Sequence, residues 1–164
     1  MASIVASKQG HNIDIYEQNK SLGKRILASG NGRCNISNKN ISSDYYFGED
    51  PSFVNYILEY FNHHKLLSFF NDLGLILNIK EDGRIYPLSN EAKSVLMVLE
   101  QASRNLGVTF VEQTEIKNIK YEKKYFIIND KKYNKVLIAT GSLSAPQLGG
   151  NDSGGKIAKY FGHT

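Results

Sequence analysis

The chain of 164 residues has a single cysteine, Cys34, and this scarcity excludes several kinds of site. One cysteine forms no intrachain disulfide, no CxxC redox pair and no cysteine-ligated zinc site. The four histidines do not show the spacing with a carboxylate that metal ligands have, so we predict no metal site. Redox chemistry in this protein would therefore depend on a bound cofactor.

Long apolar runs are missing as well. The sequence has no stretch of about 18 apolar residues that would span a membrane. Residues Met1–Val5 are shorter than the apolar segment of a signal peptide. Hydrophobic residues make up 41% of the chain and charged residues 22%, which is typical of a globular domain. We expect a cytoplasmic protein with no membrane partner.

The net charge of +4 is small, and lysines are mostly scattered among acidic residues. The one dense group, KYEKKYFIINDKKYNK over residues 120–135, alternates as a solvated strand face does. We interpret it in that way and predict no nucleic-acid partner. The sequence leaves the oligomeric state open.

The apolar periodicity predicts an α/β protein. Small residues predict a helix over Met1–Gln9, and alternation predicts a strand over Asn12–Glu17. The nearly apolar segment over Val136–Thr140 predicts a strand buried on both faces. No repeat or linker interrupts the chain, so we predict one domain over residues 1–164. Three further helices are predicted: one with Asp50 as its N-cap and Pro51 as its first residue, one near 64–73 and one over 90–106. A hairpin is predicted to turn at Asp82-Gly83. Strands are predicted near 108–111, 116–121 and 125–129, and a turn at Asn129-Asp130 follows the last of them.

The segment RILASGNGRCNISN, residues 25–38, is poor material for a core. Gly30 and Gly32 permit positive φ angles and close backbone approach, while Ser29, Arg33 and Asn35 offer hydrogen-bond donors. These features predict a loop that contacts a polar or anionic ligand. The same residue types also dominate ordinary surface turns, and this alternative stays open.

A helix of small residues, a glycine and a short strand ending in an acid resemble the second half of a dinucleotide-binding βαβ unit. Further ordered motifs are FFNDLGL, KEDGRIYPLS, VLIATGS and GGNDSGGKIAKYFGHT. Together they resemble the bacterial NAD(FAD)-utilizing dehydrogenases, or aminoacetone-oxidase-like flavoproteins. The resemblance implies a partial FAD/NAD(P)-binding, Rossmann-like, three-layer domain with a β-meander. It also implies an FAD-dependent oxidoreductase with a small-molecule redox substrate, and leaves open whether NAD(P)H is the electron donor.

The resemblance implies cofactor-binding residues in three stretches. Glu17 matches the acid that bonds the adenosine ribose, Lys24 lies where a phosphate is bound, and Ile116 lies where backbone meets adenine. We predict that Cys34 packs or makes a polar contact and is no nucleophile, because the sequence shows it no partner. No catalytic residue is predicted. The remaining implied contacts are Arg33, Cys34 and Asn35 near the flavin, and Ala139, Thr140 and Gly141 at a strand end.

The first strand of the βαβ unit and its G-x-G-x-x-G turn are not in the sequence. In the family's fold this strand lies between residues 12–17 and 136–140, so its absence leaves a gap one strand wide in the parallel sheet. We expect that the chain alone either closes this gap by bringing the two strands together, or binds FAD poorly and is inactive. The alternative function is a non-catalytic remnant or interaction module of the same fold.

Overall fold

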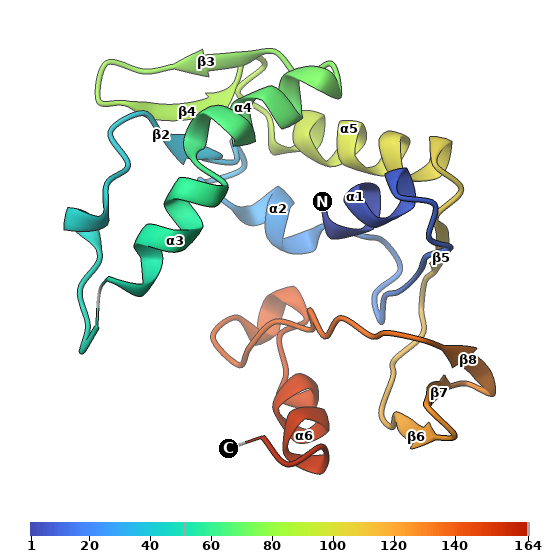
Figure 1. The fold of residues 1–164 in the computed structure, drawn as a ribbon. Coiled ribbons are helices and arrows are strands. Elements are labelled where there is room, and N and C mark those ends of the chain that lie inside the picture. The colour runs from blue at the N-terminus through green and yellow to red at the C-terminus, as the bar shows by residue number, and fades with distance from the viewer. Residues whose placement is uncertain (51, 164) are drawn as a thin grey trace. The chain divides into compact units, whose positions relative to one another are not determined.

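In the computed structural model of the chain, which describes residues 1–50 and 52–163, the elements form two compact units (Figure 1). The first unit comprises Met1–Ile13 and Arg25–Val108. The second comprises Asp14–Lys24 and the chain from Thr109 onward. Each unit has its own buried cluster, and each is described separately below.

The first unit combines helices with a small antiparallel sheet in the order β2-β4-β3. The strands are β2 (Ser37–Asn38), β3 (Leu77–Ile79) and β4 (Arg84–Pro87). The helices are α1 (Ala2–Lys8), α3 (Phe53–Tyr60), α4 (His63–Asp72) and α5 (Ala92–Asn105), with the short α2 (Lys24–Ala28) starting at the unit boundary and a 3₁₀ turn η1 (Ser43–Tyr45).

The predicted hairpin is confirmed. Strands β3 and β4 pair with Ile79 opposite Ile85. Gly83 closes the turn by donating its N–H to the Lys80 carbonyl at 2.9 Å, and the Asp82 carboxylate accepts from the Arg84 N–H at 3.0 Å. An Asp-Gly pair supplies both the side-chain acceptor and the left-handed backbone that such a turn needs.

The buried cluster of the first unit consists of Phe70 from α4, Leu75 and Val95 from α5. Helix α1, rich in small residues, lies beside α5 and buries Ile4 completely (Figure 1). Periodic apolar residues on α4 and α5 therefore form the core that the sequence predicts. Half-buried hydrophobic residues that pack against the cluster include Ile26, Cys34, Ile36 and Leu66.

The start of α3 differs from the prediction. The helix begins at Phe53 with Ser52 as its N-cap, whereas the sequence predicts Asp50 in that role. Asp50 instead accepts a hydrogen bond from the Ser52 N–H at 3.1 Å, and the predicted first residue, Pro51, lies outside the described residues. An Asp side chain that caps a turn two residues on can precede a helix without capping it.

In the second unit, β1 (Asp14–Tyr16) pairs in parallel with β5 (Thr109–Val111). A second sheet is the antiparallel meander β6 (Lys120–Glu122), β7 (Tyr125–Ile128) and β8 (Lys131–Tyr133), which confirms the predicted meander, although β6 starts later than the predicted strand near 116–121 and β8 was not predicted. A 3₁₀ turn η2 (Pro146–Leu148) and helix α6 (Ser153–Tyr160) follow. The buried cluster joins Ile119, Ile128 and Ile157, the last from α6.

The predicted strand over Val136–Thr140 is wrong. The structure assigns no strand there, and Leu137 is 73% exposed. A run of apolar residues becomes a strand only where a neighbouring strand supplies hydrogen-bond partners. In the described part of the chain the parallel sheet contains β1 and β5 alone, so residues 136–140 do not pair with β1.

We predict that Phe70→Ala lowers the free energy of unfolding by about 3–5 kcal/mol, because it empties a buried site. Urea denaturation followed by circular dichroism measures the change. Phe53→Ala is the matched control, because Phe53 is 66% exposed and Phe70 only 4%. Equal losses for the two variants would contradict the assignment of this core.

Candidate functional site

The loop that follows α2 has an unusual backbone. Gly30, Asn31, Gly32 and Cys34 all have positive φ angles, between 55° and 79°. The Cys34 N–H donates to the Ser29 carbonyl at 3.0 Å, which closes the loop on itself. The sequence prediction of a tight glycine-dependent loop is confirmed.

Gly30 is required by space as well as by its φ angle. A Cβ at this position would lie 2.8 Å from the backbone nitrogen of Asn35. The next glycine, Gly32, accepts a hydrogen bond from the Ala92 N–H at 2.8 Å, so its carbonyl satisfies the first amide of α5. The loop is therefore fixed both internally and to the start of the longest helix of the first unit.

The side chains of this loop are held by the protein itself. The Arg33 guanidinium lies 5.2 Å from the centre of the Tyr86 ring. The Asn35 amide, in the orientation that satisfies its neighbours, donates to the carbonyls of Ile85 and Ser37 at 3.2 and 3.0 Å. Three predicted residues, Arg33, Cys34 and Asn35, are thus brought together beside β4. Their contact with a flavin stays a prediction.

Cys34 is half-buried and packs against the cluster of Phe70, Leu75 and Val95. This packing is the role that the sequence predicts for it. Packing against apolar side chains is the environment of a structural cysteine.

Glu17 directly follows β1, at the carboxyl end of the parallel pair. Its N–H donates to the Val111 carbonyl at 3.0 Å, which extends the pairing with β5 by one residue. Its Oε1 accepts from the backbone N–H and the side-chain amide of Asn19 at 2.8 and 2.6 Å. Ligands of parallel sheets bind at this edge, so Glu17 has the position expected of a ribose-binding acid.

Two amides next to Glu17 were missed by the sequence reasoning. Gln18 donates from Nε2 to the Gly149 carbonyl at 2.6 Å and accepts from Asn151 at 3.1 Å. A Cβ on Gly149 would lie 2.9 Å from the Asn19 amide. The signal available in the sequence was a pair of amide residues immediately after an acid-ended strand.

Helix α6 was also missed, because its first turn contains the helix-weakening pair Gly154-Gly155. A Cβ on Gly154 would collide with Oγ1 of Thr140. The absence of that side chain lets the predicted residue Thr140 lie against the first turn of α6. The glycines in GGNDSGG are the signal that would have located this contact.

The other predicted site residues have fewer contacts that would fix their positions. Lys24 is the exposed first residue of α2, and Ala139 and Gly141 are exposed. Ile116 packs against the buried cluster of the second unit, as a core side chain does. The structure therefore gives Glu17 and Thr140 clear local partners, whereas Lys24, Ala139 and Gly141 have fewer.

Beneath this edge, Asp14 ties β1 to the meander. Its Oδ2 accepts from the Lys131 ammonium at 2.6 Å and from the Tyr133 hydroxyl, which lies 2.8 Å from the Tyr16 hydroxyl. Burial by itself raises the pKa of Asp14, but the hydrogen bonds from Lys131 and Tyr133 outweigh it, so the pKa lies below its usual value. Burial and the bond to Asp14 raise the pKa of Tyr133. The cluster thus favours an ionised carboxylate and a neutral phenol.

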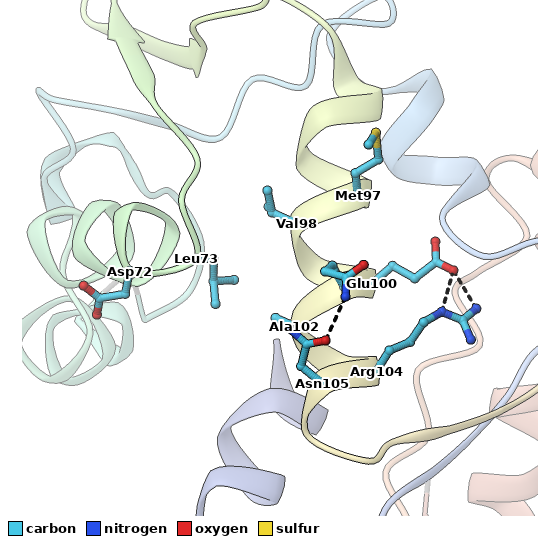
Figure 2. Close-up of a pocket in the computed structure, with 9 residues that line it drawn as sticks. Asp72, Leu73, Met97, Val98, Glu100, Ala102, Arg104 and Asn105 are labelled. Atoms are coloured by element: carbon cyan, nitrogen blue, oxygen red, sulfur yellow. Dashed lines mark hydrogen bonds and ion pairs between the residues drawn. The ribbon is translucent and has the colours of Figure 1, made fainter.

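Two pockets lie away from the predicted residues. One, of about 620 Å³, is lined by Leu73 and α5 (Figure 2). Two pairs of its polar side chains bond each other along α5, Arg104 with Glu100 at 2.7 Å and Gln101 with Asn105 at 2.7 Å, and Figure 2 shows the Arg104–Glu100 ion pair. The other, of about 510 Å³ in the second unit, has an apolar lining that includes Phe126 and Ile138. Neither lining includes one of the predicted site residues.

The described residues hold no group of three histidine, cysteine, aspartate or glutamate side chains placed to bind a metal ion. In the same residues, no helix is long and apolar enough to cross a membrane.

A protein-family model described as HI0933-like protein Rossmann domain matches residues 1–164. The chain is 35% identical, over 100% of its length, to the 3-dehydro-bile acid delta(4,6)-reductase of Clostridium scindens. It is 26% and 28% identical to the ribosomal RNA dihydrouridine synthases of Haemophilus influenzae and Escherichia coli, over 95% and 98% of its length. The chain spans 41% of the length of each of these relatives.

We predict that Asp14→Asn lowers the free energy of unfolding by about 1.5–3 kcal/mol at neutral pH, the usual range for a hydrogen bond to a charged group. Because the pKa of Asp14 is lowered by folding, its stabilisation is present above the unfolded value of about 3.9 and is lost as the pH falls through the folded-state pKa. The variant should therefore lose less stability in acid than the parent. Urea titrations at a series of pH values measure both effects.

Asp152→Asn is the control for this experiment. Asp152 pairs with Lys156 at 2.9 Å, but its side chain is 50% exposed, so solvent screens the pair. If Asp14→Asn and Asp152→Asn behaved alike, the Asp14 cluster would have no special part in stability.

Proposed function

Because the chain belongs to the HI0933-like Rossmann-domain family, we propose that the whole protein is an FAD-dependent oxidoreductase that reduces a carbon–carbon double bond. The observation that carries the proposal is the match of the complete chain to relatives whose names share one chemistry. A delta(4,6)-reductase saturates a carbon–carbon double bond, and so does an enzyme that makes dihydrouridine. Such reactions add two electrons and two protons to the substrate.

The residues at the carboxyl edge of β1 fit a dinucleotide. A ribose diol needs an acceptor for two hydroxyls, and the two oxygens of the Glu17 side chain have that capacity. Among the described residues, both hydrogen bonds recorded for the carboxylate end on Oε1 and come from Asn19. Asn19 therefore holds the carboxylate in place through one oxygen and leaves the other for a ligand.

The loop at Gly30 supports the proposal from the first unit. Its backbone has no room for a Cβ, and its side chains Arg33 and Asn35 are oriented by Tyr86 and by backbone carbonyls. A preorganised polar loop of this kind suits a planar cofactor with hydrogen-bonding edges. When bound, FAD would supply the hydride transfer, while these residues would bind and orient it.

The proposal extends to the electron donor and the compartment. We propose NAD(P)H as the donor and the cytoplasm as the site of action. The relatives leave two substrate classes, a small molecule such as a bile acid and a base in RNA, and the 35% identity to the reductase favours the small molecule.

A second candidate function is a non-catalytic module of the same fold. It is favoured by one observation, which is that residues Val136–Thr140 remain without a strand neighbour in the described structure. A protein of this kind would keep the fold and bind no flavin. Flavin content separates the two candidates.

We predict that the whole protein, expressed from its complete reading frame, copurifies with FAD and shows the absorption of oxidised flavin. Glu17→Gln keeps an oxygen that accepts from Asn19 but removes the charge, so we expect FAD affinity to fall about tenfold to a hundredfold. Titration of the apo-protein with FAD measures it. Glu112→Gln, at an exposed acid just after β5, is the control and should bind FAD as the parent does. Equal affinities for both variants would remove Glu17 from the site.

We also predict that Cys34→Ser leaves the rate of flavin reduction within about tenfold of the parent, because the thiol packs against the core and has no role as a nucleophile. Stopped-flow reduction by NAD(P)H measures this rate. A loss of about a thousandfold with unchanged FAD content would show that the thiol takes part in the chemistry.

A further inference from the structure

The positive charge of the chain is concentrated in residues 115–135. This segment holds seven of the twenty basic residues and three of the sixteen acidic residues. The rest of the chain therefore has thirteen basic and thirteen acidic residues, and the whole net charge of +4 belongs to this segment. The segment contains the β6-β7-β8 meander.

The strand register sorts the side chains of the meander onto two faces. Lys120 lies opposite Ile127, which in turn lies opposite Lys132. Neighbouring residues of a strand point to opposite faces, so Phe126 and Tyr133 lie on the other side of the sheet. Because that side packs against the buried cluster, the row of Lys120, Ile127 and Lys132 lies on the outer face.

The lysines of the segment differ in their partners. Lys131 pairs with Asp14 at 2.6 Å, and Lys117 lies 3.6 Å from Glu115. In the part of the chain that the structure describes, no ion pair is recorded for the remaining five. These exposed lysines are Lys120, Lys123, Lys124, Lys132 and Lys135.

The two turns of the meander have the same backbone form but different residues. Asn129 and Asp130, with φ of 46° and 61°, are residue types that tolerate the left-handed region. Lys123 and Lys124 occupy the other turn with φ of 49° and 72°, where lysine is disfavoured. Two lysines thus occupy a turn whose backbone conformation disfavours them. Such a departure from local preference indicates that their charge has a function beyond forming the turn.

An aromatic ring accompanies these charges. Tyr125 shares the outer face with Ile127, is 40% exposed, and has the Lys132 ammonium 6.0 Å from its ring centre. An exposed tyrosine on a sheet surface, with lysines around it, can stack a base while the lysines contact phosphates.

We propose that the outer face of the β6-β7-β8 meander, with Tyr125, Lys120 and Lys132 on the sheet and Lys123 and Lys124 in its first turn, is a binding surface for single-stranded RNA. The proposal goes beyond the solvated strand face predicted from the sequence and differs from the prediction of no nucleic-acid partner. The lysines neutralise phosphates, and Tyr125 stacks on an unpaired base. This surface needs neither a flavin nor a reaction.

The test is fluorescence anisotropy of a labelled oligouridylate of about 16 nucleotides, the upper end of the length that one small β-domain covers. Each phosphate contact adds about 0.7 to the slope of log affinity against log salt, so removing two lysines should lower the slope by about 1.4. The variant pairs are K120Q/K132Q, on the sheet, and K123N/K124N, in which asparagine suits the left-handed turn. Tyr125→Leu should weaken binding about fivefold or more without changing the slope.

The control pair K8Q/K93Q removes the same charge from exposed positions of the first unit and should bind RNA as the parent does. Equal losses in all three pairs, or no RNA binding by the parent, would overturn the proposal. Binding to phosphatidylserine vesicles in place of RNA would identify a membrane surface and would equally overturn it. None of these measurements involves flavin. A negative result would therefore overturn the RNA-binding surface without bearing on the proposed reductase activity, which the FAD titration tests.

Discussion

The bond network of Asp14 is the interaction on which the second unit depends. Asp14 begins β1, and its carboxylate holds Lys131 and Tyr133 of β8, about 120 residues later in the chain. Its side chain is only 11% exposed, so an unpaired charge there would be costly. These bonds therefore hold β1 to the meander, while β1 also pairs with β5. Together the two sets of contacts fix the position at which β1 ends.

That end is where the candidate site of the second unit forms. Glu17 is the next residue after β1, and its carboxylate is oriented by Asn19. Gln18, on the other side, bonds the loop that precedes α6. Residues 17–19 thus connect the parallel strand pair to the glycine-rich loop before α6. Their contacts depend on the register of β1, because a shift of one residue would turn each side chain to the other face.

Strand alternation gives two neighbouring lysines opposite environments. Lys131 points to the core side and neutralises Asp14, while Lys132 points outward and lies near the Tyr125 ring. One contributes to stability, and the other to the charge of the outer surface. The same meander therefore stabilises the unit on one face and offers a basic, aromatic surface on the other.

Much of the molecule was set by local sequence: helices α4 and α5, the Asp82-Gly83 hairpin, strand β7 with the turn after it and the tight loop at Gly30 form where the residues predict them. Each depends on contacts a few residues apart. Tertiary structure decided the rest. Val136–Thr140 is apolar enough for a strand but has no strand beside it, and α6 forms despite two glycines because Ile157 is buried against the meander. The partners of Asp14 and Gln18 lie more than a hundred residues away, and no local pattern specifies a pairing that only the folded chain brings within hydrogen-bond distance.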